Sequence, residues 1–119
     1  MATATVVRAD QRKCEEVPFG SLAWFTSKAQ GNSETLTTGI FVLNANNELP
    51  RHFHPNCDEV IYLFEGTVSQ SFGDEEIEMN AGDVISVPAQ VVHGTKNNSA
   101  KPARMVIIFS SADRETVMI

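Results

Sequence analysis

The stretch Arg51–Gly66 reads RHFHPNCDEVIYLFEG and contains the residues that decide the fold and the site. In an extended strand, alternate side chains share a face, so His52 and His54 point the same way, with Cα atoms roughly 7 Å apart. The dipeptide Pro55-Asn56 is a turn signal. A turn there would bring Glu59, which opens the next strand, back beside the two histidines. We therefore expect these three side chains to converge.

A third histidine completes a possible metal site. His93 lies far beyond Glu59 in the chain, at the end of another strand region. Imidazole nitrogens and a carboxylate oxygen suit one divalent transition metal ion (Fe, Mn, Ni, Co, Cu or Zn) better than Ca or Mg. Four protein ligands on a six-coordinate ion leave two positions open for water, dioxygen or a chelating substrate. On a four-coordinate zinc they leave none, and the site would be structural.

The rest of the chain has the pattern of an all-β protein. Short segments rich in β-branched and aromatic residues alternate with turn signals, which favours a sandwich or barrel. The apolar segments cover residues 22–26, 36–43, 60–64, 84–87 and 105–109. Residues 1–20 are expected to form an N-terminal arm or strand. Within them, residues 8–16 are the one place where a short helix or polar loop is expected.

Two of the expected strands are apolar on both faces. These are Glu59–Phe64 and Met105–Phe109. A half-exposed antiparallel strand should alternate polar and apolar side chains. The outer face should therefore be covered, either by the N-terminal segment or by a second subunit, and a homodimer is expected on that ground.

Composition narrows the class of protein. The chain has 119 residues, which fits one domain over residues 1–119. Its net charge of −6 argues against nucleic acid or an anionic membrane as partner. No apolar run is long enough to span a bilayer and the N-terminus lacks the apolar core of a signal peptide, so a cytoplasmic location is expected. The two cysteines are interpreted as reduced thiols.

The spacing of the ligands resembles the two motifs of the cupin superfamily. The first motif ends His-x-His, three or four residues, Glu, six residues, Gly. Here it reads His52-Phe-His54, four residues, Glu59, six residues, Gly66. Fifteen residues then separate Gly66 from Gly82, as in small bacterial cupins.

The second motif runs Gly, five residues, Pro, x, Gly, two residues, His, three residues, Asn. Here it reads Gly82, five residues, Pro88, Ala89, Gln90, two residues, His93, three residues, Asn97. Gln90 replaces a glycine, which suggests a different turn before His93. In the first motif, Asn46 replaces the opening glycine, a change that asparagine tolerates because it adopts left-handed geometry.

This resemblance implies a double-sheet jelly-roll barrel with the metal inside, and it covers residues 46–97. It also implies that His52, His54, Glu59 and His93 are the ligands. Cupins include metalloenzymes as well as small-ligand carriers and sensors, so a small-molecule ligand or substrate is expected.

Three further residues are candidates for the surroundings of the site. Asn97 shares strand parity with His93 and could orient a ligand histidine; the alternative is a turn-forming asparagine. Gln70 is a candidate for a cavity-facing position. Gln90 could place its amide near the pocket mouth. Cys57 is interpreted as a small buried thiol in the hairpin turn rather than a metal ligand.

Several functions remain open at this point. A mononuclear metalloenzyme of the dioxygenase type is favoured, because an isomerase, epimerase or lyase needs a general base and all three histidines are already used as ligands. The alternatives are such a metal-dependent isomerase, epimerase or lyase, a non-catalytic ligand-binding cupin, and a closed structural zinc site.

Overall fold

Short antiparallel strands make up most of the chain in the computed structural model, which describes residues 3–119. The first two residues of the expected N-terminal arm lie outside this range. The strands are β1 (Lys13–Val17), β2 (Gly20–Thr26), β3 (Thr37–Leu43), β4 (Glu48–Phe53), β5 (Glu59–Glu65), β6 (Thr67–Phe72), β7 (Glu75–Asn80), β8 (Val84–Val87), β9 (His93–Lys96), β10 (Ala103–Phe109) and β11 (Val117–Met118). The only helical element in the described range is η1 (Ala9–Gln11), a single turn of 3-10 helix.

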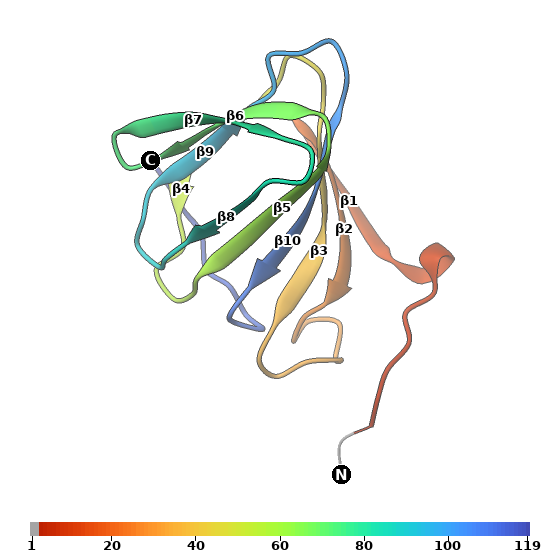
Figure 1. Cartoon of the computed structure of the whole chain (residues 1–119). Helices are drawn as coiled ribbons and strands as arrows, with labels where there is room; N and C mark the ends of the chain where they lie inside the picture. Colours follow the sequence, from red (N-terminus) through yellow and green to blue (C-terminus); the bar gives the residue numbers. More distant parts are fainter. Residues whose placement is uncertain (1–2) are drawn as a thin grey trace.

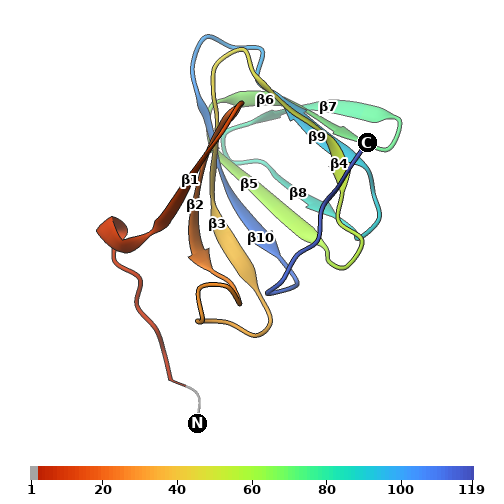
Figure 2. The same cartoon turned by 180° about the vertical axis from the view of Figure 1, so that it is seen from behind.

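These strands form two antiparallel sheets that face each other (Figures 1 and 2). One sheet has the order β1-β2-β3-β10-β5-β8, and the other has the order β11-β4-β9-β6-β7. Neighbouring strands are mostly distant in sequence, as when β10 lies between β3 and β5. This arrangement confirms the predicted all-β jelly-roll fold.

The interior between the sheets is filled by alternating side chains. In β3 and β10 every second residue is buried, as the pleat of a strand requires. In β5, Glu59, Ile61 and Leu63 point inward, which confirms the predicted parity. The fully buried cluster comprises Phe41, Leu43, Cys57, Ile61, Leu63, Val68, Met79, Ala103, Met105, Ile107 and Phe109. Cys57 is thus a buried thiol, as expected.

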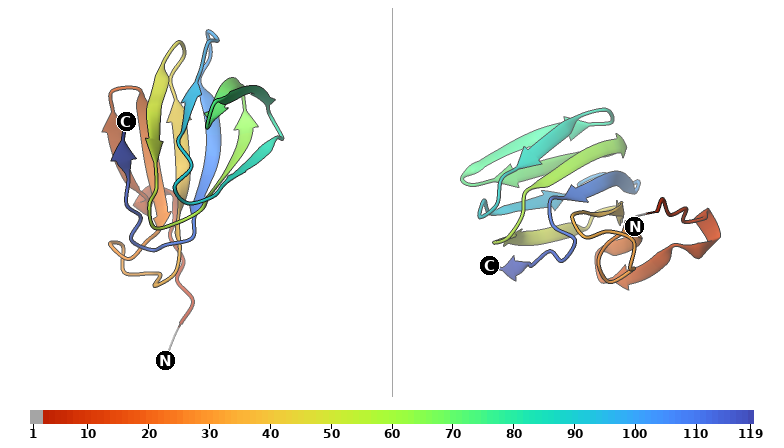
Figure 3. Two further views of the ribbon diagram at one scale, coloured as in Figure 1. Left: turned by 90° about the vertical axis from the view of Figure 1, so that its left-hand side faces the viewer. Right: turned by 90° about the horizontal axis from the view of Figure 1, so that it is seen from below.

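The outer face of the larger sheet is not covered by the N-terminal segment. Instead, β1 pairs with β2 and extends the sheet at its edge. The described residues before β1, from residue 3 onward, lead away from the barrel (Figure 3). The short helix or loop expected over residues 8–16 is helical only at η1, and from Lys13 onward the chain is a strand. On the outer face, Tyr62 remains 40% exposed and Val84 56% exposed.

In two turns the chain has another residue where the cupin motifs have glycine. Asn46 and Gln90 both have a positive φ, so both occupy the left-handed region that glycine adopts most easily. The prediction that Asn46 tolerates this geometry is confirmed. The different turn expected at Gln90 is not found: Gln90 keeps the positive φ that favours glycine at that point and adds a side-chain amide to it.

No helix within residues 3–119 is long and apolar enough to cross a membrane. The cytoplasmic location stays a prediction.

Candidate metal centre

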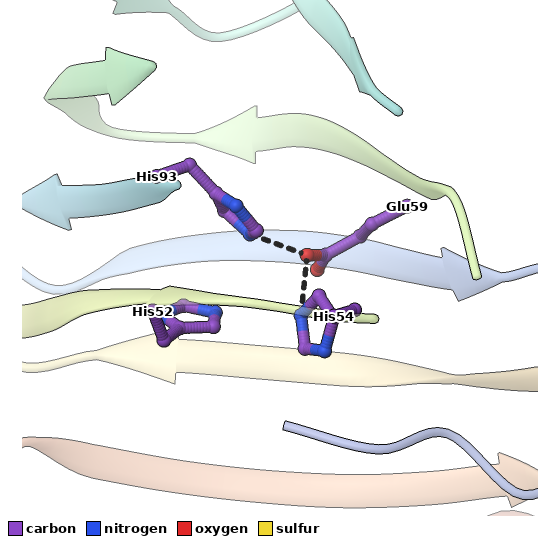
Figure 4. Close-up of side chains that lie close together, drawn as sticks. All are labelled: His52, His54, Glu59 and His93. Carbon is purple, nitrogen blue, oxygen red and sulfur yellow. Dashed lines mark hydrogen bonds and ion pairs between the residues drawn. The ribbon is translucent and has the colours of Figure 1, made fainter. Parts of the chain in front are cut away.

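The two sheets together position the four expected ligands. His52 lies near the end of β4, His54 follows that strand directly, and His93 opens β9. Glu59 opens β5 in the opposite sheet. All four side chains are buried and point toward one another (Figure 4). An ion bound among them would therefore join the two sheets.

Strand pairing sets the separation of the histidine rings. His52 lies directly opposite His93 in the pairing of β4 with β9, and their ring centroids are 4.4 Å apart. The ring of His54 is 5.0 Å from that of His52, its neighbour on the same face. On its other side, His54 packs edge-on against Phe109 at 5.0 Å between centroids.

Backbone carbonyls orient all three imidazoles. The Nδ1–H groups donate to Pro50 O at 2.8 Å from His52, to Glu115 O at 2.9 Å from His54, and to Val91 O at 2.9 Å from His93. A carbonyl can only accept, so each Nδ1 carries the proton. In a neutral ring, Nε2 then carries no proton, and its lone pair is available to a metal. Such outer hydrogen bonds are typical of metal-binding histidines.

The carboxylate of Glu59 contacts two of these nitrogens. Its Oε1 lies 2.9 Å from His93 Nε2 and 3.3 Å from His54 Nε2. Burial by itself lowers the pKa of His93, but the hydrogen bond and charge of Glu59 raise that pKa overall. Burial likewise acts to raise the pKa of Glu59, and its contacts with His54 and His93 lower that pKa overall. Without a metal, Glu59 and His93 thus each favour the charged form of the other.

The donor set fits a metal cation. His54 Nε2 is buried. It lies only 3.3 Å from Glu59 Oε1, but it makes no well-directed hydrogen bond within the described residues. An orphaned buried nitrogen of this kind carries a desolvation penalty that a bound ion would remove. One donor atom from each of the four residues lies within 4.8 Å of the other three. The four residues could therefore hold one divalent ion, as predicted.

The titration of His52 is strongly shifted by its surroundings. Burial lowers its pKa to about 4, and the nearby His93 and His54 act in the same direction. It stays neutral at physiological pH, which leaves its Nε2 free for a cation.

A cavity of about 180 Å³ opens onto His52, His54 and Glu59. Its walls come from both sheets and are mostly apolar. They include Leu22, Trp24, Phe41, Leu49, Ile107 and Phe109. For comparison, an engineered apolar cavity of roughly 150 Å³ holds one benzene molecule. The space beside the histidines therefore suits a ligand of about one ring.

The cavity also contains residues that sequence reasoning missed. Arg114 and Thr116 line it from the segment between β10 and β11. The same segment supplies Glu115 O, which orients His54. Asn56 holds the segment in place, since its side chain donates to Asp113 O at 3.0 Å and accepts from Glu115 N at 2.9 Å. Contacts to backbone atoms leave no motif in a sequence, so no signal pointed to this segment.

The other predicted site residues lie around the centre without lining the cavity. Gln70 is fully buried in β6 opposite Thr95, whose hydroxyl donates to Gln70 Oε1 at 2.7 Å. Gln90 binds the chain after His54, through its backbone N–H to His54 O at 3.0 Å and its side-chain amide to Pro55 O at 2.9 Å.

Asn97 faces inward with His93 and Thr95, as its strand parity predicted. Its amide nitrogen donates to the carbonyls of Leu43, Asn44 and Lys101. Its carbonyl oxygen accepts from the backbone N–H and the hydroxyl of Ser99. These contacts fix the loops at the far end of the barrel, so the structure favours the turn-forming alternative over a role in orienting a histidine.

Two relatives match parts of this chain. Germin-like protein subfamily 2 member 1 from Arabidopsis thaliana is 36% identical over 67 residues, which cover 52% of this chain and 31% of that protein. Quercetin 2,3-dioxygenase from Bacillus subtilis (strain 168) is 25% identical over 103 residues, which cover 71% of this chain and 30% of that protein. The chain thus spans about a third of the length of these relatives.

Solved structures match most of the fold. An oxalate decarboxylase from Lactobacillus farciminis, in a formate complex, superposes with a TM-score of 0.83 at 19% identity, covering 92% of this chain and 34% of the other. The oxalate decarboxylase of Bacillus subtilis, studied for its Mn(II) centres, superposes with a TM-score of 0.79 at 22% identity, covering 87% and 29%. At these identities the match establishes the fold alone.

A model of the family described as the cupin domain matches residues 39–109, more than half of the chain and a range that includes all four expected ligands. The chain belongs to the cupin family.

Proposed function

We propose that this protein is a mononuclear metalloenzyme that acts on a small chelating substrate, with a dioxygenase-like oxidation as the favoured reaction. The observation that carries the proposal is the orphaned Nε2 of His54, which faces Glu59 at the end of an apolar cavity. A buried nitrogen that makes no well-directed hydrogen bond and lies 3.3 Å from a carboxylate oxygen is expected where a cation binds.

In this proposal His52, His54, His93 and Glu59 hold one divalent transition metal. When bound, such an ion supplies Lewis acidity and, if it is redox-active, electron transfer with dioxygen. The Mn(II) centres of the Bacillus subtilis oxalate decarboxylase support a divalent ion but do not fix its identity here. The protein's own contribution is to orient the three imidazoles through hydrogen bonds to backbone carbonyls and to surround the substrate with mostly apolar cavity walls.

The set of titratable groups supports oxidation over proton-transfer chemistry. Within residues 3–119, the titratable side chains that line the cavity are His52, His54, Glu59 and Arg114. The first three are the proposed ligands, and a guanidinium does not act as a base near neutral pH. An isomerase, epimerase or lyase needs a separate base. The relationship to quercetin 2,3-dioxygenase supports the same choice.

Dioxygen uptake tests the reaction. The full chain, reconstituted separately with Fe, Mn, Ni, Co and Cu, is supplied with 2,4-pentanedione, a small thiol and a flavonol in an oxygen electrode. Uptake with at least one pair of metal and substrate, lost in His54→Ala and kept in Phe53→Ala, is the expected result. Phe53 is a suitable control because it lies between the two histidines in sequence, on the opposite side of the strand.

The alternatives appear as other outcomes. Turnover of a hydroxy-keto or sugar substrate without dioxygen uptake would indicate an isomerase, epimerase or lyase in place of the proposed dioxygenase. Tight binding of a small anion without turnover would indicate a ligand-binding cupin. A bound zinc ion with no exchangeable water would indicate a structural site and end the enzyme proposal.

For the assembly and location, we propose a homodimer in the cytoplasm. The exposed apolar side chains on the outer face of the larger sheet include Tyr62, Phe64, Val84 and Ile108. A cluster of this kind favours a protein partner. Light scattering should give twice the chain mass for the wild type and the mass of one chain for Tyr62→Glu; a monomeric wild type would contradict the proposal.

A further inference from the structure

Arg114 is the only positively charged side chain lining the cavity within the described residues. It lies in the segment between β10 and β11, next to the part of that segment that orients His54. Its Cζ lies 4.9 Å from the centroid of Phe109, and the Phe109 ring lies 5.0 Å from that of His54. The guanidinium and the metal centre are thus linked through a single aromatic ring.

Two aromatic rings lie beside the guanidinium of Arg114. Its Cζ is 4.8 Å from the centroid of Trp24 as well as 4.9 Å from that of Phe109. These contacts are cation–π attractions, and they supply no oxygen acceptor to the N–H donors of the guanidinium. The donors therefore remain available to an acceptor.

Those donors have little to bind in the protein. The Nη1 group donates to Thr116 Oγ1 at 3.0 Å. Among residues 3–119, no carboxylate lies within ion-pair distance of Arg114. Burial lowers the pKa of Arg114, partly offset by the charges of Glu59 and Glu15. A half-buried cation with free donors in an apolar cavity favours an anionic ligand.

We propose that Arg114 binds the carboxylate of the substrate, and that this substrate is an apolar compound of about one ring whose opposite end carries the metal-chelating oxygens. The inference rests on the proposed function for the chelating end only. The planar guanidinium pairs with a carboxylate through two parallel hydrogen bonds, which a neutral amide cannot reproduce.

Two probe compounds distinguish the effect of the negative charge on binding from the effect of the ring. Both 3,4-dihydroxybenzoate and 3,4-dihydroxybenzamide carry a chelating pair of oxygens and one ring, and they differ in the negative charge at the other end. Their dissociation constants are measured by calorimetry on the full chain, with redox-inert zinc bound and with no metal. Charge-assisted pairing should make the wild type bind the benzoate roughly 10- to 100-fold more tightly than the benzamide.

Two variants locate the source of this preference. In Arg114→Gln, the ratio of the two dissociation constants should fall to about one. Arg104→Gln removes the same charge from an exposed position, where Arg104 pairs with Glu65 on the surface, and should keep the wild-type ratio. Because each ratio is taken within one protein, a general loss of affinity in a variant cancels.

The outcomes also distinguish this inference from the proposed function. Equal binding of the two probes by the wild type would overturn the role of Arg114, as would a preference that persists in Arg114→Gln. The wild-type comparison decides the matter even if the variant fails to fold. If neither probe gains affinity when metal is bound, the proposed chelation by the metal is wrong. The comparison of benzoate with benzamide still tests the role of Arg114 in that case.

Discussion

Replacing His52 with glutamine tests how the buried histidine behaves when no metal is present. His52 is only 5% exposed, and burial lowers its pKa from 6.5 to about 4. In the unfolded chain it titrates near 6.5. The folded metal-free protein therefore binds fewer protons than the unfolded chain between these values. The stability that His52 contributes is complete above pH 6.5 and is lost as the pH falls toward 4.

The size of the effect follows from the two pKa values. Between pH 8 and pH 5, a histidine shifted in this way removes about 2 kcal/mol from the free energy of unfolding. His93 acts in the opposite direction, because its pKa is raised. Its stabilising contribution is complete below pH 6.5 and is lost as the pH rises through the folded-state value.

Urea unfolding in the presence of a chelator measures both effects through the fluorescence of the single tryptophan, Trp24. From pH 8 to pH 5, the wild type should lose about 2 kcal/mol more stability than His52→Gln. His93→Gln should lose more stability than the wild type over the same range, since it lacks the acid-side contribution. An identical pH dependence of the wild type and His52→Gln would refute the burial and neutrality of His52.

Three further substitutions test other parts of the structure. Asn56→Ala removes both side-chain bonds that hold the segment orienting His54, so metal affinity in calorimetry should fall about 10-fold; unchanged affinity would show that the segment needs no such tether. Leu63→Ala empties a fully buried position and should lower the free energy of unfolding by about 3 kcal/mol in urea; a loss well under about 1 kcal/mol would place Leu63 outside the core. Thr95→Val leaves the buried Gln70 Oε1 without its donor and should lower stability by about 1–3 kcal/mol with metal content unchanged; loss of the metal would mean that this pair belongs to the centre.

Much of the fold and the four candidate ligands could be predicted from the sequence. Ligand spacing and strand parity are local properties, so the shared face of His52 and His54 and the inward direction of Glu59 follow from period two. The apolar segments all lie within strands or overlap them. Strands β6 and β7 were harder to predict, because β7 buries Met79 alone and otherwise carries exposed, largely acidic residues.

The surroundings of the site depend on contacts between distant segments. Asn97 was correctly expected to face inward, but its partners come from a loop much earlier in the chain as well as from its own loop. Arg114 stands in a polar C-terminal stretch whose path across the barrel is set by Asn56. Neither set of contacts produces a periodicity or a residue spacing that can be recognised in a single sequence.

Metal content tests the central claim most directly. The full chain, purified without chelators and measured by inductively coupled plasma mass spectrometry, should contain one equivalent of a divalent transition metal per chain. His54→Ala should contain almost none, and His52→Ala should lose far more than Phe53→Ala. Retention of a full equivalent by folded His54→Ala would contradict the assignment of the centre to these four residues.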